Sequence, residues 1–185
     1  MNKIKITTNA TSLCRTRPCM IITTLHENGV VNAGTFGAYT NVGPKQIGIA
    51  IGAPTDTYRN IKRDGEFVIN IPSIEHAAAL QTCGMNPPHD VSELDLAKLT
   101  AEPASIVKVP LIAECVANIE CRYWKELEIG YHNFVVGEVL CGHLREDLVD
   151  SDGFIDVVKA RVAFGIRYPE PVFAVLGQVK RVPDA

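Results

Sequence analysis

Short apolar segments of strand length, joined mostly by short polar connections, constrain the fold of this chain more than any other feature. The segments MIITTL (20–25) and GVVNAG (29–34) flank HENG, whose Asn28-Gly29 pair is a strong signal for a tight hairpin turn. QIGIAIG and EFVINI follow as further strand candidates. About six or seven strands without a regular βαβ alternation favour a closed or partly closed antiparallel barrel over a Rossmann sheet.

Two segments interrupt the strand pattern with helical signals. TDTYRNIKRDG has Thr55 or Asp56 to cap its start and Gly65 to end it. Residues 73–100 also read as helical, with the loop GMNPPHD between two helices. The expected fold class is therefore mainly β with helical insertions (a β-barrel, α+β), and the length suits a single domain over residues 1–185.

Two later segments differ in their strand pattern. Residues 112–123 alternate, with Cys121 on the apolar face and Glu120 on the opposite face, which predicts a half-buried antiparallel strand. Residues 132–144 are apolar at both parities, as expected for a strand that is covered on both sides. Gly137 in the middle of that strand predicts a bend or bulge.

Composition and charge exclude several classes of protein. Hydrophobic residues make up 46% and charged residues 21%, as in ordinary globular proteins. A net charge of −3 provides no basic field, so no nucleic-acid partner is expected. The chain has no apolar segment of signal-peptide or membrane-spanning length, so we expect a cytoplasmic protein without a membrane partner.

The cysteines and histidines lack the spacing of a metal site. No CxxC pair occurs, and no HxxxH pair with a nearby acid, which disfavours a zinc ribbon, a redox dithiol and a zinc hydrolase. Most cysteines fall in apolar segments and are expected to be buried thiols, with a metal site or a disulfide as the alternative. The six cysteines are Cys14, Cys19, Cys83, Cys115, Cys121 and Cys141.

The segment NAGTFGAYTN (32–41) is unusually rich in small residues, with only Phe36 and Tyr39 bulky. Small residues in a row allow something to approach the backbone closely. One interpretation is a long connection between barrel strands, and the other is a surface for a ligand, with the hydroxyls of Thr35 and Thr40 as donors. The segment contains neither a GxGxxG nor a Walker motif, so the common nucleotide fingerprints are excluded.

The predicted helix after Thr55 offers a second candidate site. A helix start presents free N–H groups that favour a phosphate, and Thr57, Arg59 and Asn60 add polar side chains. A solvated, capped surface helix is the alternative. If NAGTFGAYTN and this helix start met at one barrel rim, they would suit a flat apolar ring with a phosphate tail.

Three residues in the later part of the barrel pattern have separate interpretations. His132 begins a strand and is expected at the barrel mouth, either in a donor pocket or as a hydrogen-bonded strand-end histidine. Glu138 points to the same face as His132 and needs a partner, which an interface ion pair would supply. Trp124 is expected to pack rather than to stack on a ligand.

Four segments carry a resemblance to a known family. In order along the chain they are RPCMIITTLHENGVVNAGTFGAYTNVGPKQIGIAIG, DTYRNIKRDGEFVINIP, PLIAECVANIECRY and GYHNFVVGEVL. The chain resembles, from Arg17 to Val179, the flavin reductase-like proteins with an FMN-binding split barrel, which include flavoredoxins and ferric-flavin reductases. The resemblance implies a homodimer of split β-barrels with one FMN per subunit near the dimer interface.

The resemblance also implies the site residues. His132 matches the family's GDH motif in a donor pocket, whereas Tyr131 replaces its acid. No metal and no catalytic side chain is implied, because FMN itself carries the chemistry. The cofactor-binding residues implied are Gly34, Thr35, Phe36, Gly37, Ala38, Thr40, Asn41, Gly52, Thr57, Arg59 and Asn60.

The function that the resemblance implies is that of an FMN-dependent NAD(P)H:flavin or ferric oxidoreductase. Electrons would pass from a reduced nicotinamide or a similar small donor through FMN to flavin, ferric iron or a protein acceptor. Tyr131 motivates an alternative, a flavin- or haem-binding carrier or sensor of the same fold without catalysis. A purely structural dimer is a further alternative, which leaves the small-residue segment and the helix start unexplained.

Overall fold

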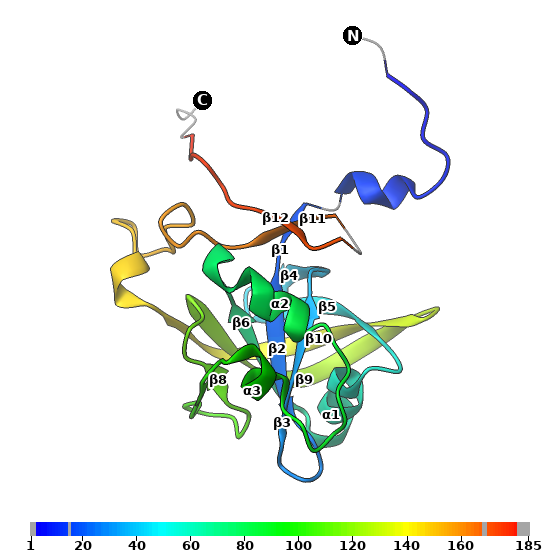
Figure 1. Ribbon diagram of the computed structural model, residues 1–185, viewed down its shortest axis with the longest axis vertical. Coiled ribbons are helices and arrows are strands. Elements are labelled where there is room, and N and C mark those ends of the chain that lie inside the picture. Colours follow the sequence, from blue (N-terminus) through cyan, green and yellow to red (C-terminus); the bar gives the residue numbers. More distant parts are fainter. Residues whose placement is uncertain (1–2, 15, 168–169, 181–185) are drawn as a thin grey trace.

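A seven-stranded antiparallel sheet dominates the computed structural model, which describes residues 3–14, 16–167 and 170–180 (Figure 1). The strand order is β3-β2-β6-β9-β10-β5-β4. The mainly β class with helical insertions is confirmed. The strands are β2 (Met20–Leu25), β3 (Val31–Phe36), β4 (Tyr39–Gly43), β5 (Gln46–Gly52), β6 (Glu66–Ile71), β9 (Ala117–Ile129) and β10 (His132–Leu144).

The two edges of this sheet are brought together by a two-residue crossing. β3 and β4 stand at opposite ends of the strand order, yet only Gly37 and Ala38 separate them. Three peptide links span at most roughly 11 Å, so the sheet must curl until its edges approach each other. The segment NAGTFGAYTN is therefore the end of one edge strand, a two-residue crossing and the start of the other edge strand. It is not a long loop.

The curled sheet encloses one apolar core and carries a second on its outer face. On β2, Met20 and Ile22 point into the barrel, whereas Ile21 points outward beneath the helices. Gly137 gives room inside the barrel, because a Cβ there would lie 2.5 Å from the Phe67 ring. The ladder between β9 and β10 shifts register at Gly137, which confirms the predicted bulge. The buried members of the barrel core are Met20, Ile22, Ile47, Ile49, Ile51, Ile61, Phe67, Ile69, Cys121 and Val135.

The helices follow the predicted positions, and the first has the predicted ends. α1 (Asp56–Asp64) begins after the N-cap Thr55 and ends at Gly65, whose φ of 73° is left-handed. The helical region after residue 73 is shorter than expected and broken into pieces, which pack on the outer face of β2 and β3 (Figure 1). These pieces are η2 (Ile74–His76), α2 (Ala77–Thr82) and α3 (Glu93–Ala97).

Smaller elements complete the described chain. A three-stranded sheet lies beyond the barrel near α2, and its strand β11 was not predicted (Figure 1). The elements are η1 (Ala10–Cys14), β1 (Arg17–Pro18), β7 (Ala101–Glu102), β8 (Leu111–Ile112), η3 (Glu146–Leu148), β11 (Phe164–Arg167) and β12 (Val172–Ala174). Among the residues described, no helix is long and apolar enough to cross a membrane.

The structure corrects two expectations about residues 112–124. The segment is not one strand, because β8 ends at Ile112 and β9 begins only at Ala117. Glu120 is fully buried rather than solvent-facing, since residues 105–107 cover it and donate backbone N–H groups to its carboxylate. Trp124 is 52% exposed and lies outside the core of the single chain.

The cysteines are free thiols in the described structure. Cys19, Cys83, Cys115 and Cys121 are buried, as predicted, whereas Cys14 is exposed and Cys141 is partly exposed. Burial raises the pKa of the Cys83 thiol to about 12, which keeps it protonated at neutral pH. The disulfide alternative is wrong, because all six cysteines are described and free.

Candidate functional site

The start of α1 is anchored to the end of β5. The Thr55 hydroxyl donates to the Gly52 carbonyl (2.8 Å) and accepts from the Tyr58 N–H (3.3 Å). Gly52 in turn lies opposite His132, the first residue of β10 and an exposed one. Three of the expected site elements, the end of β5, the start of α1 and His132, therefore meet at one end of the barrel.

Thr57 and Asn60 face the protein interior. Both are only 3% exposed. The Asn32 amide donates to the Thr57 hydroxyl (3.1 Å) and to the Thr24 hydroxyl (2.9 Å), and the Asn60 amide donates to Thr24 as well (3.0 Å). These bonds hold α1 against β2 and β3, since buried polar groups require partners. The side chains of Thr57 and Asn60 thus have structural partners, and Arg59 is the expected phosphate residue that reaches solvent.

The small residues of β3 and the crossing have two different surroundings. A Cβ at Gly34 would lie 2.7 Å from the Thr57 hydroxyl and 2.8 Å from the Phe36 ring, so helix packing explains this glycine. A Cβ at Gly37 would meet no atom within 4 Å. The backbone at Gly37 is therefore open to an approaching molecule.

The remaining expected residues spread along both edge strands. The Thr35 hydroxyl donates to the Leu80 carbonyl (2.6 Å), which ties β3 to α2. Thr40 and Asn41 are exposed on β4, where they pair with Gly48 and Ile47 of β5. At roughly 3.3 Å per residue, these positions lie about 13–17 Å along β5 from Gly52. Gly34 and Thr57 thus meet, whereas Thr40 and Asn41 lie apart from the start of α1.

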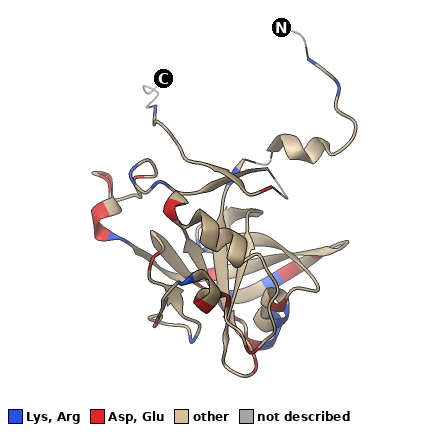
Figure 2. Ribbon diagram, viewed as in Figure 1, with Lys and Arg blue, Asp and Glu red and all other residues tan. Residues whose placement is uncertain are grey.

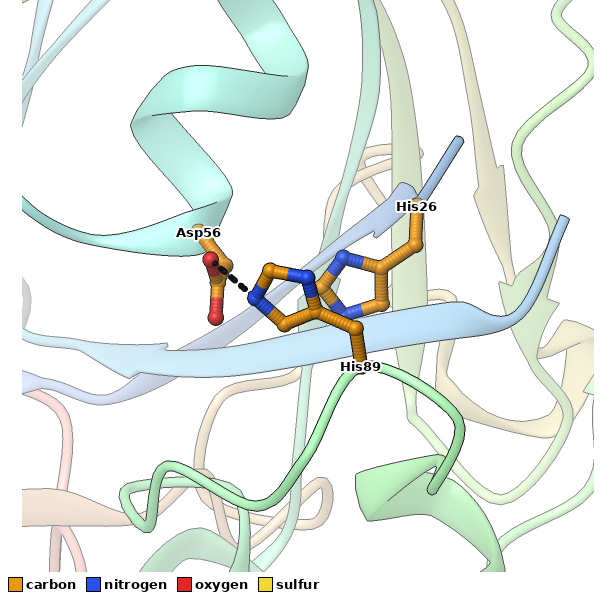
Figure 3. Close-up of side chains that lie close together, drawn as sticks. All are labelled: His26, Asp56 and His89. Carbon is orange, nitrogen blue, oxygen red and sulfur yellow. Dashed lines mark ion pairs between the residues drawn. The ribbon is translucent and has the colours of Figure 1, made fainter. Parts of the chain in front are cut away.

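An open pocket of about 510 Å³ lies beside α1. His26 from the hairpin and His89 from the loop before α3 stack their rings, with centroids 4.5 Å apart and planes at 18° (Figure 3). The Asp56 carboxylate pairs with His89 Nε2 at 3.0 Å. The pocket is lined by His26, Glu27, Asn28, Asp56, Arg59, Asn60, Arg63 and His89.

The charges and the ring geometry of this pocket disfavour a metal ion. Arg59 pairs with Asp56, so that carboxylate is already neutralised. Imidazole lone pairs lie in the ring plane, so the two nearly parallel rings cannot direct both lone pairs at one ion. Burial, and then the neighbouring His89, lower the pKa of His26. Figure 2 shows charges of both signs on and beside α1.

A second open pocket, of about 400 Å³, is lined mostly by residues of β9 and β10. Lys62 of α1 donates to Glu126 (2.9 Å), which lines this pocket. Trp124 is 52% exposed and Leu127 is 62% exposed, which gives the pocket an apolar wall. Apolar surface of this kind is typical of an interface or a ligand groove. The lining residues are Val42, Gln46, Trp124, Lys125, Glu126, Leu127, Phe134 and Val136.

Sequence reasoning missed the pocket residues His26, Arg63 and His89. The two histidines are far apart in the chain, one in the hairpin signal HENG and one in the loop GMNPPHD, and no motif links them. The sequence pattern places Arg63 only at the end of the predicted helix. Its spacing from Arg59, four residues along a helix, was the one available signal that two arginines share a face.

Family comparison identifies the class of protein that this fold represents. The family model of the flavin reductase like domain matches residues 13–158. The chain therefore belongs to the flavin reductase-like family. Its two curved edges, joined across Gly37 and Ala38, are those of a split β-barrel.

A relative shares the sequence of this chain, and two solved structures share its fold. An uncharacterized protein of Halalkalibacterium halodurans is 33% identical over 158 residues, which cover 78% of this chain and 75% of that protein. The crystal structure of nitrilotriacetate monooxygenase component B from Bacillus cereus superposes with a TM-score of 0.86 at 24% identity, over 98% of this chain and 100% of that one. Flavoredoxin of Desulfovibrio vulgaris also gives 0.86, at 21% identity, over 97% of both chains.

Proposed function

We propose that this protein is an FMN-dependent flavin reductase. Electrons pass from a reduced nicotinamide, or a similar small donor, through FMN to a flavin, ferric iron or a protein acceptor. Membership of the flavin reductase-like family carries the proposal. The names of two structural neighbours, a flavoredoxin and a monooxygenase component B, point to the same redox class.

The residues at the crossing fit a flat cofactor. Because a Cβ at Gly37 would meet no atom within 4 Å, a ring system has room to lie along this backbone. The exposed Thr40 and Asn41 follow directly on β4 and offer a hydroxyl and an amide to a polar ring edge or to the ribityl chain. When bound, FMN supplies the hydride and electron chemistry, so no nucleophile or acid–base pair is needed from the protein.

The pocket beside α1 fits the phosphate of FMN. Arg59 donates one N–H to the Pro54 carbonyl (2.7 Å) and another to the Asp56 carboxylate. A guanidinium has five N–H donors, so three remain for an anion. Arg63 lines the same pocket one helical turn further along.

His132 and the apolar pocket complete the proposal. His132 is exposed beside Gly52, at the end of the barrel where α1 begins, and it orients the nicotinamide donor. The apolar wall around Trp124 and Leu127 contacts a second copy of the chain, which makes the active form a homodimer. The protein's own tasks are to hold the ring, to exclude water from its face and to admit donor and acceptor in turn.

Replacing Gly37 by valine tests where the ring lies. The backbone at Gly37 has no left-handed φ and no neighbour within 4 Å, so the variant should fold with unchanged stability. The valine side chain would occupy the space of the ring, and we expect FMN affinity to fall at least tenfold, or about 1.4 kcal/mol. Fluorescence titration of FMN measures the affinity, and urea unfolding measures the stability.

Gly177→Val is the matched control, because Gly177 is equally open but lies on the segment after β12. It should bind FMN as the wild type does. Equal FMN affinity in the Gly37→Val and Gly177→Val variants would refute the placement of the ring on the crossing.

A further inference from the structure

Three potential metal ligands meet on β9 and β10, away from the residues assigned to FMN. Cys141 lies opposite Glu120 in the ladder, and His143 is two residues further along β10. Residues two apart on a strand point to the same face, so the thiol and the imidazole are neighbours. A register shift between Val139 and Cys141 turns Cys141 to the side of Glu120.

The three donor atoms have the mutual spacing of a tetrahedral ligand set. The Cys141 Sγ lies 3.3 Å from Glu120 Oε1 and 3.6 Å from His143 Nε2, and Nε2 lies 2.8 Å from Oε1. Zinc bonds of about 2.0–2.3 Å at tetrahedral angles separate such donors by roughly 3.3–3.6 Å. Displacements of about half an ångström or less would therefore complete the set.

Backbone donors hold the carboxylate in place. Glu120 is fully buried, and it accepts N–H bonds from Ser105 (2.8 Å), Ile106 (2.7 Å) and Val107 (2.9 Å). The same carboxylate presents Oε1 to the Cys141 thiol and to the His143 imidazole. Hydrogen-bonded ligating carboxylates of this kind are typical of metal sites.

The charge and the access of this cluster also suit a cation. Glu120 is paired with His143, a side chain that can itself ligate a metal ion. In the pocket beside α1, by contrast, Asp56 is paired with Arg59, a permanent cation that neutralises it. A carboxylate, a thiolate and a neutral imidazole balance the two charges of a divalent ion. The His143 side chain is 34% exposed and Cys141 is partly exposed, so an ion can enter from solvent.

We propose that Glu120, Cys141 and His143 bind one divalent, thiophilic metal ion, with Zn²⁺ as the expected ion and water as its fourth ligand. Three protein ligands with one open position form the donor set of accessible zinc sites, and thiolate ligands select against Mg²⁺ and Ca²⁺. The bound ion ties β9 and β10 to the segment 105–107. Binding releases the thiol proton of Cys141 to solvent, and the proton on His143 Nε2 that faces Glu120 leaves this nitrogen, for solvent or for Nδ1, so that Nε2 can ligate the ion.

Equilibrium dialysis of the full chain against Zn²⁺, in the presence of a non-thiol reductant, tests the site. We expect one Zn²⁺ per chain for the wild type and loss of this ion in Cys141→Ser and His143→Gln. Both positions are partly exposed, so both variants should fold, and circular dichroism checks this. Cys14→Ser and His89→Ala should keep the ion, because they remove an exposed thiol and a histidine of the other cluster.

Alkylation gives a second readout that does not depend on a variant. Iodoacetamide labelling followed by peptide mass spectrometry should show that Zn²⁺ slows modification of Cys141 and leaves the exposed Cys14 unchanged. No Zn²⁺ binding, binding that survives Cys141→Ser, or binding that is lost in His89→Ala would each overturn the proposal. Neither readout requires FMN, so the result stands apart from the flavin reductase proposal.

Discussion

Arg59 is the residue through which α1 reaches the phosphate in the proposed function. Its side chain is 55% exposed and keeps three free N–H donors beside the open pocket. The side chains of Thr57 and Asn60, its neighbours on the helix, are hydrogen-bonded to residues of β3 and β2. In the proposed function, Arg59 therefore carries more of the phosphate contact than Thr57 and Asn60 do.

Arg59→Ala should weaken FMN binding roughly tenfold, or about 1.4 kcal/mol. This value lies at the lower end of the range for a hydrogen bond to a charged group, because the Arg59 side chain is about half exposed. Fluorescence titration measures the change. Arg145→Ala is the control, because Arg145 is 53% exposed and paired with Asp147 outside the pocket. If both variants bind FMN equally well, Arg59 does not bind the phosphate.

His26 links protonation to stability. Burial and the adjacent His89 lower its pKa below the ordinary 6.5, so the unfolded chain takes up this proton at a higher pH than the folded chain. The contribution of His26 is present above pH 6.5 and is lost as the pH falls through the lower, folded pKa. In urea unfolding, the wild type should be less stable at about pH 5.5 than at about pH 7.5. The His26→Gln variant should show a smaller loss of stability between these two pH values.

The exposed His132 supplies the comparison for this pH dependence. His132→Gln should follow the wild-type stability at both pH values. A His26→Gln variant whose stability depends on pH as steeply as that of the wild type would show that another group is responsible.

At the scale of elements, the packing of α1 on β3 depends on the absence of a side chain at Gly34. A methyl group there would lie 2.7 Å from the Thr57 hydroxyl and 2.8 Å from the Phe36 ring. Gly34→Ala should therefore destabilise the protein by about 1–3 kcal/mol through overpacking, as measured by urea unfolding.

Gly37→Ala, three residues further along, is the matched substitution in open space. We expect it to change stability by less than about 0.5 kcal/mol. Equal stability of the two alanine variants would contradict the close approach of α1 to β3.

Local signals determined which elements could be predicted. α1 was predicted with both ends because Thr55 and Gly65 lie beside it in the sequence. Burial of Glu120 could not be predicted, since it depends on backbone N–H groups of residues 105–107 that fold back over β9. The stacking of His26 on His89 likewise joins two loops without a shared motif.

Within the candidate site, the crossing between the edge strands also has features that local sequence signals could not predict. The sequence shows that NAGTFGAYTN is rich in small residues, but it does not show that different positions are small for different structural reasons. Gly34 makes room for α1, whereas Gly37 is open. Only the tertiary pairing of β3 with β2 and of β4 with β5 reveals this difference.

At the scale of the whole molecule, the exposed apolar wall on β9 is the expected dimer contact. Trp124, Leu127 and Ile129 are 52%, 62% and 57% exposed in the single chain. Burial of each large apolar side chain contributes about 1.5–3 kcal/mol, so a charge in this wall should oppose association. We expect the wild type to be a dimer and Leu127→Glu to be a monomer by analytical ultracentrifugation.

Phe154→Glu controls for the general effect of a charge on an exposed apolar position, because Phe154 is 71% exposed and lies outside the wall. It should leave the dimer intact. A monomeric wild type, or a dimeric Leu127→Glu variant, would remove β9 from the proposed interface.

In the proposed function, the split barrel holds FMN and passes electrons through it. The most direct test is the visible absorption spectrum of the protein reconstituted with FMN and separated from free cofactor, before and after anaerobic addition of NADH. We predict a retained flavin spectrum that bleaches when NADH is added. A retained spectrum that neither NADH nor NADPH bleaches would favour the carrier or sensor alternative, and a protein that retains no flavin would contradict the account.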